Sequence, residues 1–533
     1  MYVGLAYKRS NKMTRVYFVL LILNGSAVFQ SVHAARMLCI YPVPFHSHQA
    51  VFQVMTEALA AEGHELVVLT PLPHEKPIPN VTEIDVHDIS YKLWEDGYGE
   101  YQKTHEFTAD PVTFWEEAVT PIMHGIVDAQ MSSPGMQALI QDQNQQFDVI
   151  LVEPVVPLSI MIAARFDAPV ILVSSFFGGD DSFLTIGAPI HPIYFPEFNM
   201  QRIGNMTFWE RVKQIYTTLR LRWMERSFKD KENAMIRKHF GKDAPTITEL
   251  MKRVEMLFLN VHPIWDNNRP VPPSVVYMGA LHLRNPKPIP KDLQSYLDAS
   301  KNGVVYMSLG SKIRFSDLPE GTMQVFLNVF ASLPYDVLIK WNGGELKNKP
   351  ANVRLEKWLP QNDMLHHPKI KVFLMQGGLQ STDEAIAANV PLIGFPVFGD
   401  QFYNAQMFMK LDIGRQLDIK TINEQDLRQA ILDVAENERY RRNIASLSLV
   451  LQEQRAGGLQ RAVRGAARVA ARAARPLRSP LADASLAQTL MLDVLVAVAT
   501  GAVVTTVGTA VLALLLYRAV RRAVGTQPKL KSK

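Results

Sequence analysis

A group of residues suited to binding a phosphorylated ligand lies within 372–401 (VFLMQGGLQSTDEAIAANVPLIGFPVFGDQ). An apolar strand-like run ends at Gly377 and Gly378, where a helical pattern begins. Glycines let a ligand approach the backbone closely, and the free N–H groups of a helix start attract anions, so this turn is suited to a diphosphate. Glu384, one to two turns into that helix, is placed to accept hydrogen bonds from ribose hydroxyls.

Further polar and aromatic residues flank this turn. Asp400 and Gln401 follow another strand-like run and offer an acceptor and an amide to sugar hydroxyls. Upstream, Trp358 and Gln361 offer an aromatic plane and an amide that can contact a base. A lone tryptophan is more typical of core packing. The joint spacing of Trp358 with the downstream group favours binding instead.

Two sets of alternating strands and helices are expected to position these residues. In the first half we predict strands at 36–41, 65–69, 148–152, 170–174 and 256–259, a loop at 42–48 and a helix from Gln49 to about Glu62. In the second half we predict strands at 303–309, 336–340, 370–374 and 391–395 and helices near 323–331 and 382–389. A proline-rich stretch separates the halves, so we expect a parallel α/β fold with a ligand cleft between two domains.

The segment around QGGLQSTDEAI resembles the signature of the UDP-glycosyltransferases, the membrane-bound animal glucuronosyl- and glucosyltransferases. It is most similar to the insect enzymes and the related baculovirus ecdysteroid glucosyltransferase. The resemblance extends over nearly the whole chain and implies a GT-B fold, in which two Rossmann-like domains face a cleft. It also implies an inverting transferase that uses a UDP-sugar as co-substrate and needs no cofactor.

The resemblance assigns the donor contacts to the second domain. Trp358 would stack on uracil, Gln361 would contact the base or ribose, and Glu384 would bind ribose. The phosphates would be approached by Ser311, Gln380 and Ser381, and the sugar by Asp400 and Gln401.

Gln376 departs from most of the family, which has histidine before the two glycines. Glutamine can donate a hydrogen bond to the diphosphate but carries no positive charge, and charge-assisted bonds are roughly twice as strong as neutral ones. Stabilisation of the leaving group would therefore rest more on backbone amides and the helix end. Since insect and viral members share this glutamine, we do not interpret it as inactivation.

The resemblance places the catalytic base in Ser47-His48-Gln49, at His48. A neutral imidazole can take a proton from an attacking hydroxyl. His46 is the alternative, two residues away. A carboxylate that orients the histidine is expected at Glu153, where many relatives have aspartate; Asp148, at the start of the same strand, is the alternative.

No Asp-x-Asp triplet of the metal-dependent glycosyltransferases occurs, and no metal is expected. The single cysteine, Cys39, excludes an intrachain disulfide framework and a zinc ribbon. On the acceptor side, aromatic residues gather between 176 and 198, which suits either an apolar acceptor or ordinary core packing. We expect small lipophilic hydroxylated acceptors. The alternatives are a lipid- or sterol-directed transferase and a non-catalytic binding partner, and a homo- or hetero-oligomer is possible.

Both ends of the chain indicate a membrane protein. Four basic groups precede an apolar run and small residues near Ala34, which is typical of a cleaved signal peptide, with a short anchor as the alternative. Residues 494–517 carry no charged side chain and are long enough to span a bilayer. Arg518, Arg521 and Arg522 follow, which predicts a cytoplasmic tail.

We therefore expect a type I protein of the endoplasmic reticulum membrane. Lys529 and Lys531 resemble a dilysine retrieval signal, with a plain basic tail as the alternative, and sequons at Asn80 and Asn205 fit lumenal catalytic domains. Removing the ten basic groups of residues 1–35 and 518–533 from the net charge of +5 leaves −5 for the body, so nucleic acid is not an expected partner.

The chain divides into seven expected segments. These are a signal peptide (1–35), an acceptor-binding domain (36–265), a linker (266–285), a UDP-sugar-binding domain (286–454), an Ala/Arg-rich juxtamembrane segment (455–489), a transmembrane helix (490–517) and a basic tail (518–533). Arginines recur every three or four residues in the Ala/Arg-rich segment, which predicts a solvated helix face rather than one lying on the membrane.

Overall fold

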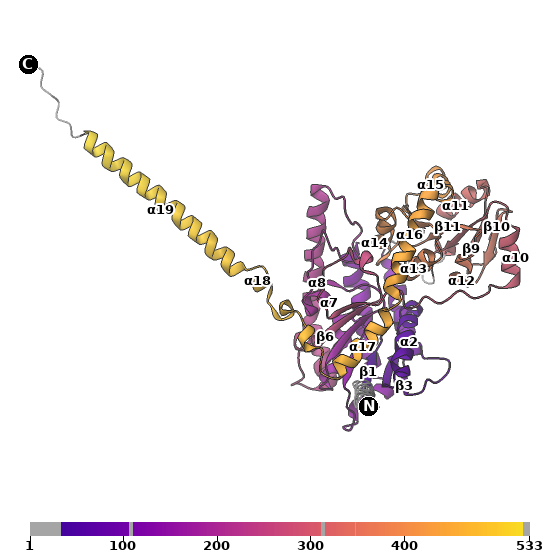
Figure 1. Cartoon of the computed structure of the whole chain (residues 1–533), viewed down its shortest axis with the longest axis horizontal. Helices are drawn as coiled ribbons and strands as arrows, with labels where there is room; N and C mark the ends of the chain where they lie inside the picture. Colours follow the sequence, from indigo (N-terminus) through magenta and orange to yellow (C-terminus); the bar gives the residue numbers. More distant parts are fainter. Residues whose placement is uncertain (1–33, 106–109, 311–314, 347, 526–533) are drawn as a thin grey trace, which may run out of the picture.

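The fold is described from a computed structural model, which covers residues 34–105, 110–310, 315–346 and 348–525. The signal peptide, Ser311, Lys529 and Lys531 lie outside these residues, apart from the last two positions of the signal segment. The described part forms two α/β domains and a long C-terminal helix that extends away from them (Figure 1).

The first domain is built on a sheet of parallel strands in the order β3-β2-β1-β4-β5-β6-β7. The strands are β1 (Arg36–Ile40), β2 (Glu65–Thr70), β3 (Val81–Asp85), β4 (Val149–Val152), β5 (Val170–Ser174), β6 (Val254–Leu259) and β7 (Val275–Tyr277). The central strands are buried along their length, as expected for a parallel sheet covered on both faces. The last strand, β7, lies within the stretch predicted to be the linker.

The helices of this domain cover both faces of the sheet. They are α2 (His46–Ala61), α3 (His87–Thr104), α4 (Pro111–Phe114), α5 (Thr120–Met131), α6 (Pro134–Gln141), α7 (Asp180–Ile186), α8 (Phe208–Phe240) and α9 (Ile247–Met251). A π-helical turn (Trp115–Val119) joins α4 to α5, and 3-10 helices lie at Pro157–Ala164 and Pro263–Asp266.

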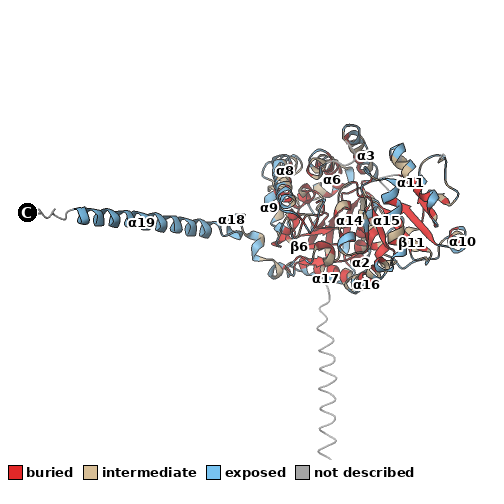
Figure 2. Ribbon diagram, turned by 90° about the horizontal axis from the view of Figure 1, so that it is seen from above, coloured by how far each residue is buried: buried red, intermediate tan, exposed pale blue. Residues whose placement is uncertain are grey.

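The second domain repeats the same topology. Its parallel sheet has the order β10-β9-β8-β11-β12-β13, with β8 (Val304–Ser308), β9 (Asp336–Lys340), β10 (Val353–Glu356), β11 (Ile370–Met375), β12 (Leu392–Gly394) and β13 (Gly414–Gln416). Its helices are α10 (Lys291–Ala299), α11 (Glu320–Ser332), α12 (Gln361–Leu365), α13 (Leu379–Ala387), α14 (Gln401–Lys410), α15 (Glu424–Glu436) and α16 (Glu438–Arg455), with a 3-10 turn at Phe315–Asp317. The inner strands of both sheets are red in Figure 2, which marks them as the buried centre of each domain. The prediction of two Rossmann-like domains is confirmed.

The Ala/Arg-rich segment does not simply connect the second domain to the membrane helix. Its helix α17 (Gly458–Ala470) returns to the first domain and packs against α2 and strands β4 to β7 (Figure 1). The alanine, glycine and valine side of α17 is buried there, while Arg461, Arg464 and Arg468 are exposed on the other side. The arginines are exposed, as predicted; whether this face is solvated or lies on the membrane stays a prediction. The small-residue face opposite was missed.

After α17 the chain leaves the body. Short 3-10 turns (Arg475–Leu477 and Pro480–Asp483) and α18 (Leu486–Thr489) lead to α19 (Leu492–Gly525), whose most apolar stretch has a mean hydropathy of 2.0. No residue of that stretch is buried, and the helix is long and apolar enough to cross a membrane.

Candidate active site

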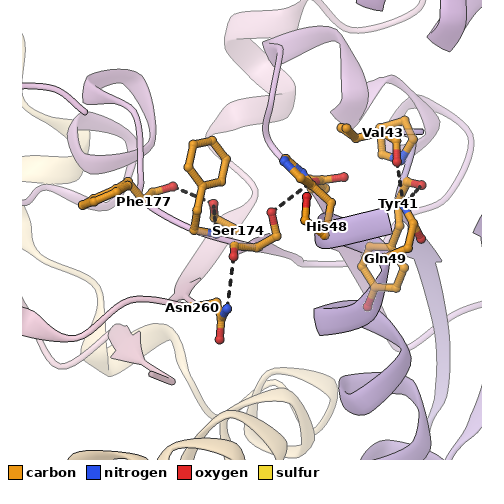
Figure 3. A network of polar contacts seen from close by, with 12 residues as sticks. Tyr41, Val43, His48, Gln49, Ser174, Phe177 and Asn260 are labelled. Carbon is orange, nitrogen blue, oxygen red and sulfur yellow. Dashed lines mark hydrogen bonds and ion pairs between the residues drawn. The ribbon is translucent and has the colours of Figure 1, made fainter. Parts of the chain in front are cut away.

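His48 lies in the first turn of α2 and not in the preceding loop, because the helix begins at His46. The side chain of Gln49 fixes this turn: its Nε2 donates to the carbonyls of Tyr41 and Val43 at 3.2 and 2.8 Å, and its Oε1 accepts from Thr70 (Figure 3). Gln49 is buried, so the end of β1 and the start of α2 are held together from inside. The Ser-His-Gln sequence thus supplies both a histidine and the residue that positions it.

His48 forms a close pair with Glu153. Nδ1 of His48 lies 2.5 Å from Oε1 of Glu153, the residue that follows β4. Ser175 Oγ lies 3.5 Å from the same carboxylate oxygen. Burial raises the pKa of the Glu153 carboxyl, and the neighbouring His48 lowers it. With Nδ1–H directed at the carboxylate, Nε2 is the nitrogen left to take a proton. Neither alternative residue makes this contact: Asp148 instead accepts the backbone N–H of Arg36 at 2.8 Å.

Two aromatic rings flank the imidazole. The ring centroids of Phe45 and Phe176 lie 5.4 and 5.3 Å from that of His48. Phe176 also lines a pocket of the first domain. Phe177 and Phe198 line it as well, so these three rings of the aromatic-rich stretch face a cavity. Phe183 and Phe195 instead lie beside the guanidinium of Arg269, and Tyr194 is exposed.

The second domain gathers the predicted base and ribose contacts. Gln361, at the start of α12, accepts a hydrogen bond from Tyr306 and donates to Ser381 at 2.9 Å and to Glu384 at 2.6 Å. Burial raises the pKa of Glu384, and the hydrogen bond from Gln361 lowers it. The side chains of α12, α13 and β8 therefore meet at one point.

Trp358 is not a core residue. It is 73% exposed, and the ammonium of Lys340 lies 4.9 Å from its ring centroid. The core-packing interpretation of this tryptophan is wrong. The open aromatic face is available for stacking on a ligand.

The turn before α13 has the geometry expected of a diphosphate site. Gly377 has φ +97°, and a Cβ there would lie 2.9 Å from the carbonyl oxygen of Gln401, so only glycine fits without strain. The amide Nε2 of Gln376 lies against Gly310, where any side chain would collide with it, and close to Gly378. Gln376 thus presents a donor beside the start of α13.

Asp400 is joined to this turn. Its Oδ2 accepts hydrogen bonds from the backbone N–H of Leu379 at 3.3 Å and from Asn404 at 2.8 Å. Burial raises the pKa of Asp400 to about 6. The next residue, Gln401, uses its Oε1 to accept from the N–H groups of Val397 and Phe398. The oxygen of its side-chain amide therefore holds the loop that precedes α14.

Asn404 was missed by sequence reasoning. It is fully buried and donates to Gly377 O and Asp400, while its Oδ1 accepts from Trp265 Nε1 of the first domain at 2.9 Å. In the sequence, the only sign that Asn404 belongs to the site was its position one helical turn after Asp400. A second link between the domains joins Gln380 to the turn that carries His48, because Gln380 Nε2 donates to Ser47 O.

The remaining predicted positions are sequons. Asn80 and Asn205 are both exposed, with φ of 63° and 45°, in turns that precede β3 and α8. Within the described residues, no group of three or more His, Cys, Asp or Glu side chains is arranged to hold a metal ion.

Two facing Rossmann-like domains, with a His–Glu pair on one and a glycine turn at a helix start on the other, define a GT-B glycosyltransferase. Solved structures share the fold. The structure aligns with UDP-glucose: anthocyanidin 3-O-glucosyltransferase in complex with UDP at a TM-score of 0.53 and 15% identity, covering 80% of this chain and 98% of that one. It aligns with the calicheamicin glycosyltransferase CalG4 at 0.52 and 16% identity, covering 83% and 99%.

The chain belongs to the UDP-glucoronosyl and UDP-glucosyl transferase family, whose model matches residues 37–527. It is 37% identical over 458 residues to the ecdysteroid UDP-glucosyltransferase of Spodoptera littoralis nuclear polyhedrosis virus, covering 82% of this chain and 88% of the relative. It is 29% identical to UDP-glucosyltransferase 2 of Dactylopius coccus, covering 84% and 86%. The protein is thus a transferase that uses a UDP-sugar donor.

Proposed function

We propose that the protein transfers glucose from UDP-glucose to a hydroxyl group of small lipophilic acceptors, with inversion at the anomeric carbon. The observation that carries this proposal is the His48–Glu153 pair, which is joined through Gln380 to the donor-site helix. The His48 ring also lies beside Phe176, which lines the pocket of the first domain. The acceptor hydroxyl would lie against Nε2 of His48, and the glucose on the opposite side, toward Asp400 and Gln401.

The reaction follows from this arrangement. His48 Nε2 takes the hydroxyl proton as the oxygen forms a bond to the anomeric carbon, and the bond from that carbon to the UDP oxygen breaks, so UDP leaves with the electron pair. Glu153 stabilises the imidazolium that forms. The developing charge on the diphosphate meets the N–H groups at the start of α13 and the amide of Gln376, and Ser311 and Ser381 complete the phosphate contacts. No cofactor is required in this scheme.

Glucose is favoured as the donor sugar because the relatives named above are glucosyltransferases. The test is a donor competition with membranes that contain the protein, in which UDP-glucose, UDP-glucuronate and UDP-galactose are supplied with phenol, flavonoid and steroid acceptors. Glucoside formation that disappears in His48→Ala supports the proposal. Preference for another donor contradicts it, and UDP binding without any product would favour a non-catalytic partner.

We further propose a role in detoxification or hormone conjugation at the endoplasmic reticulum membrane. In this arrangement α19 anchors the protein, both domains are lumenal, Asn80 and Asn205 carry glycans, and Lys529 and Lys531 direct retrieval. Protease treatment of sealed microsomes tests the topology: both domains are expected to be protected and sensitive to endoglycosidase after permeabilisation. Digestion of the domains in sealed vesicles would contradict it.

A further inference from the structure

The pocket beside His48 is apolar near the catalytic pair and acidic away from it. Pro154, which follows Glu153 in the sequence, and Phe176, whose ring lies beside His48, line one part of the pocket. The part formed with α7 and α8 is lined by four carboxyl side chains, Asp181, Glu197, Glu225 and Glu232. No lysine, arginine or histidine lines this pocket in the described part of the chain.

Nearby cations only partly balance these acids. Arg222 lies 3.5 Å from Asp180, next to the pocket, and Nε2 of the buried His124 lies 3.2 Å from Glu232. Burial and the neighbouring acids raise the pKa of Glu197 to about 8 and that of Glu225 well above its usual range. Buried carboxyls without full compensation are costly, which indicates that the cluster is kept for binding rather than for stability.

A second feature of the same pocket points to a ligand. Asn199 lines it and is 4% exposed, yet its Oδ1 has no hydrogen-bond partner among the described residues. Buried polar atoms are nearly always satisfied, so an unpaired acceptor on a pocket wall marks a place for a donor. The indole N–H of Trp115, which also lines the pocket, has no hydrogen-bond partner among the described residues either.

We propose that this acidic end binds a hydrogen-bond-donating group of the acceptor that carries no negative charge. Preferred acceptors would then have an apolar body between the reacting hydroxyl at His48 and a second group, a hydroxyl or a protonated amine, at the far end. This inference rests on the proposed transfer to small acceptors. It adds a requirement for two polar ends and excludes a distal carboxylate.

The test uses full-length protein in membranes, UDP-glucose and 4-alkylphenols that end in methyl, hydroxyl, ammonium or carboxylate. We expect the hydroxyl or ammonium acceptor to exceed the methyl acceptor in kcat/KM, although the methyl chain is more hydrophobic, and the carboxylate to be the poorest. Asn199→Leu is expected to lower the preference for the donating end about 3- to 10-fold, the usual effect of one hydrogen bond. At pH 9, above the Glu197 pKa of about 8, Glu197→Gln distinguishes the two donors, since losing a charge weakens ammonium binding more than hydroxyl binding.

Glu345→Gln, which alters an exposed carboxylate of the second domain, is the matched control and is expected to keep the wild-type ranking. A methyl or carboxylate acceptor that equals the hydroxyl and ammonium acceptors would overturn the inference, provided that phenols are glucosylated at all. Absence of any phenol glucoside would instead contradict the proposed function.

Discussion

The side-chain amide of Gln380, in the first turn of α13, donates to the backbone carbonyl of Ser47, the residue before His48. One hydrogen bond therefore joins the helix that is expected to hold the diphosphate to the turn that carries the base. The backbone carbonyl of Gln380 also accepts from His282, whose pKa burial lowers to about 4, so a neutral imidazole N–H completes the junction.

Gln380→Ala is expected to lower kcat roughly 10-fold while the Kd for UDP changes little, because misalignment of bound reactants costs rate more than affinity. The measurements are steady-state kinetics and UDP titration. Gln324→Ala, on the exposed side of α11, is the control. A loss confined to UDP affinity would show that Gln380 only binds the donor.

His48→Ala is expected to lower kcat/KM by about 10²- to 10⁴-fold, the usual contribution of a general base. His46→Ala changes a residue of the same helical turn that does not contact Glu153, and this variant is expected to retain nearly full activity. Glucoside formation by the two variants is compared under identical conditions. Equal losses would mean that the turn, and not the imidazole, is required.

Glu153→Gln is expected to lower kcat by about 10²- to 10⁴-fold, because an amide can hold the imidazole in the wrong tautomer and cannot stabilise imidazolium. The KM for the donor is expected to stay close to the wild-type value. Asp148→Asn, at the other end of β4, is the matched acidic control. Wild-type rates in Glu153→Gln would remove this residue from the mechanism.

Trp358→Ala is expected to raise the KM for UDP-glucose about 5- to 100-fold, since base–aromatic stacking contributes roughly 1–3 kcal/mol. Because the ring is exposed, the variant is expected to keep the wild-type melting temperature, which thermal melting would check. Acceptor KM is expected to be unaffected. An unchanged donor KM would show that the ring does not contact the base.

Asp400 predicts a pH dependence of stability. Its pKa is about 6 in the folded protein against 3.8 for the unperturbed group, so the folded state retains the proton that the unfolded chain releases. Stability of the ligand-free protein is therefore expected to fall as the pH rises from about 4 to 6, by at most about 3 kcal/mol at roughly 1.4 kcal/mol per pKa unit. Asp400→Asn removes this component, as denaturation at a series of pH values would show. An unchanged pH profile in the variant would contradict the assignment.

The sequence predicted the inner strands well because buried parallel strands are short apolar runs between turns. It predicted no strand at the edges of the two sheets, where β3, β7, β10 and β13 lie. It misplaced His48 in a loop, since Pro42 and Pro44 suggested irregular backbone and α2 begins at His46 with no side-chain cap. It also missed Asn404 and the acidic end of the pocket. Asp181, Glu197 and Glu225 lie on α7, on the segment between α7 and α8, and on α8, and only the packing of these elements brings them to one pocket.

The Ala/Arg-rich segment shows that the residue pattern on both faces of a predicted helix has to be considered. The arginine spacing was recognised, but Ala462, Ala466 and Val469 recur with the same helical period on the opposite side. Gly458 and Gly465 lie so close to Met278 and Phe258 that a side chain would collide. Small residues in this pattern indicate a helix packed closely against a sheet.

Because α17 completes the covering of the first sheet, the first domain is discontinuous in sequence. During synthesis its strands emerge long before the helix that closes their outer layer, and the whole second domain is made in between. A fragment that ends at residue 285 would leave Met256, Phe258 and Met278 in water, so the first domain is not expected to fold when expressed alone. Removal of the membrane helix for secretion therefore has to cut after α17, not before it.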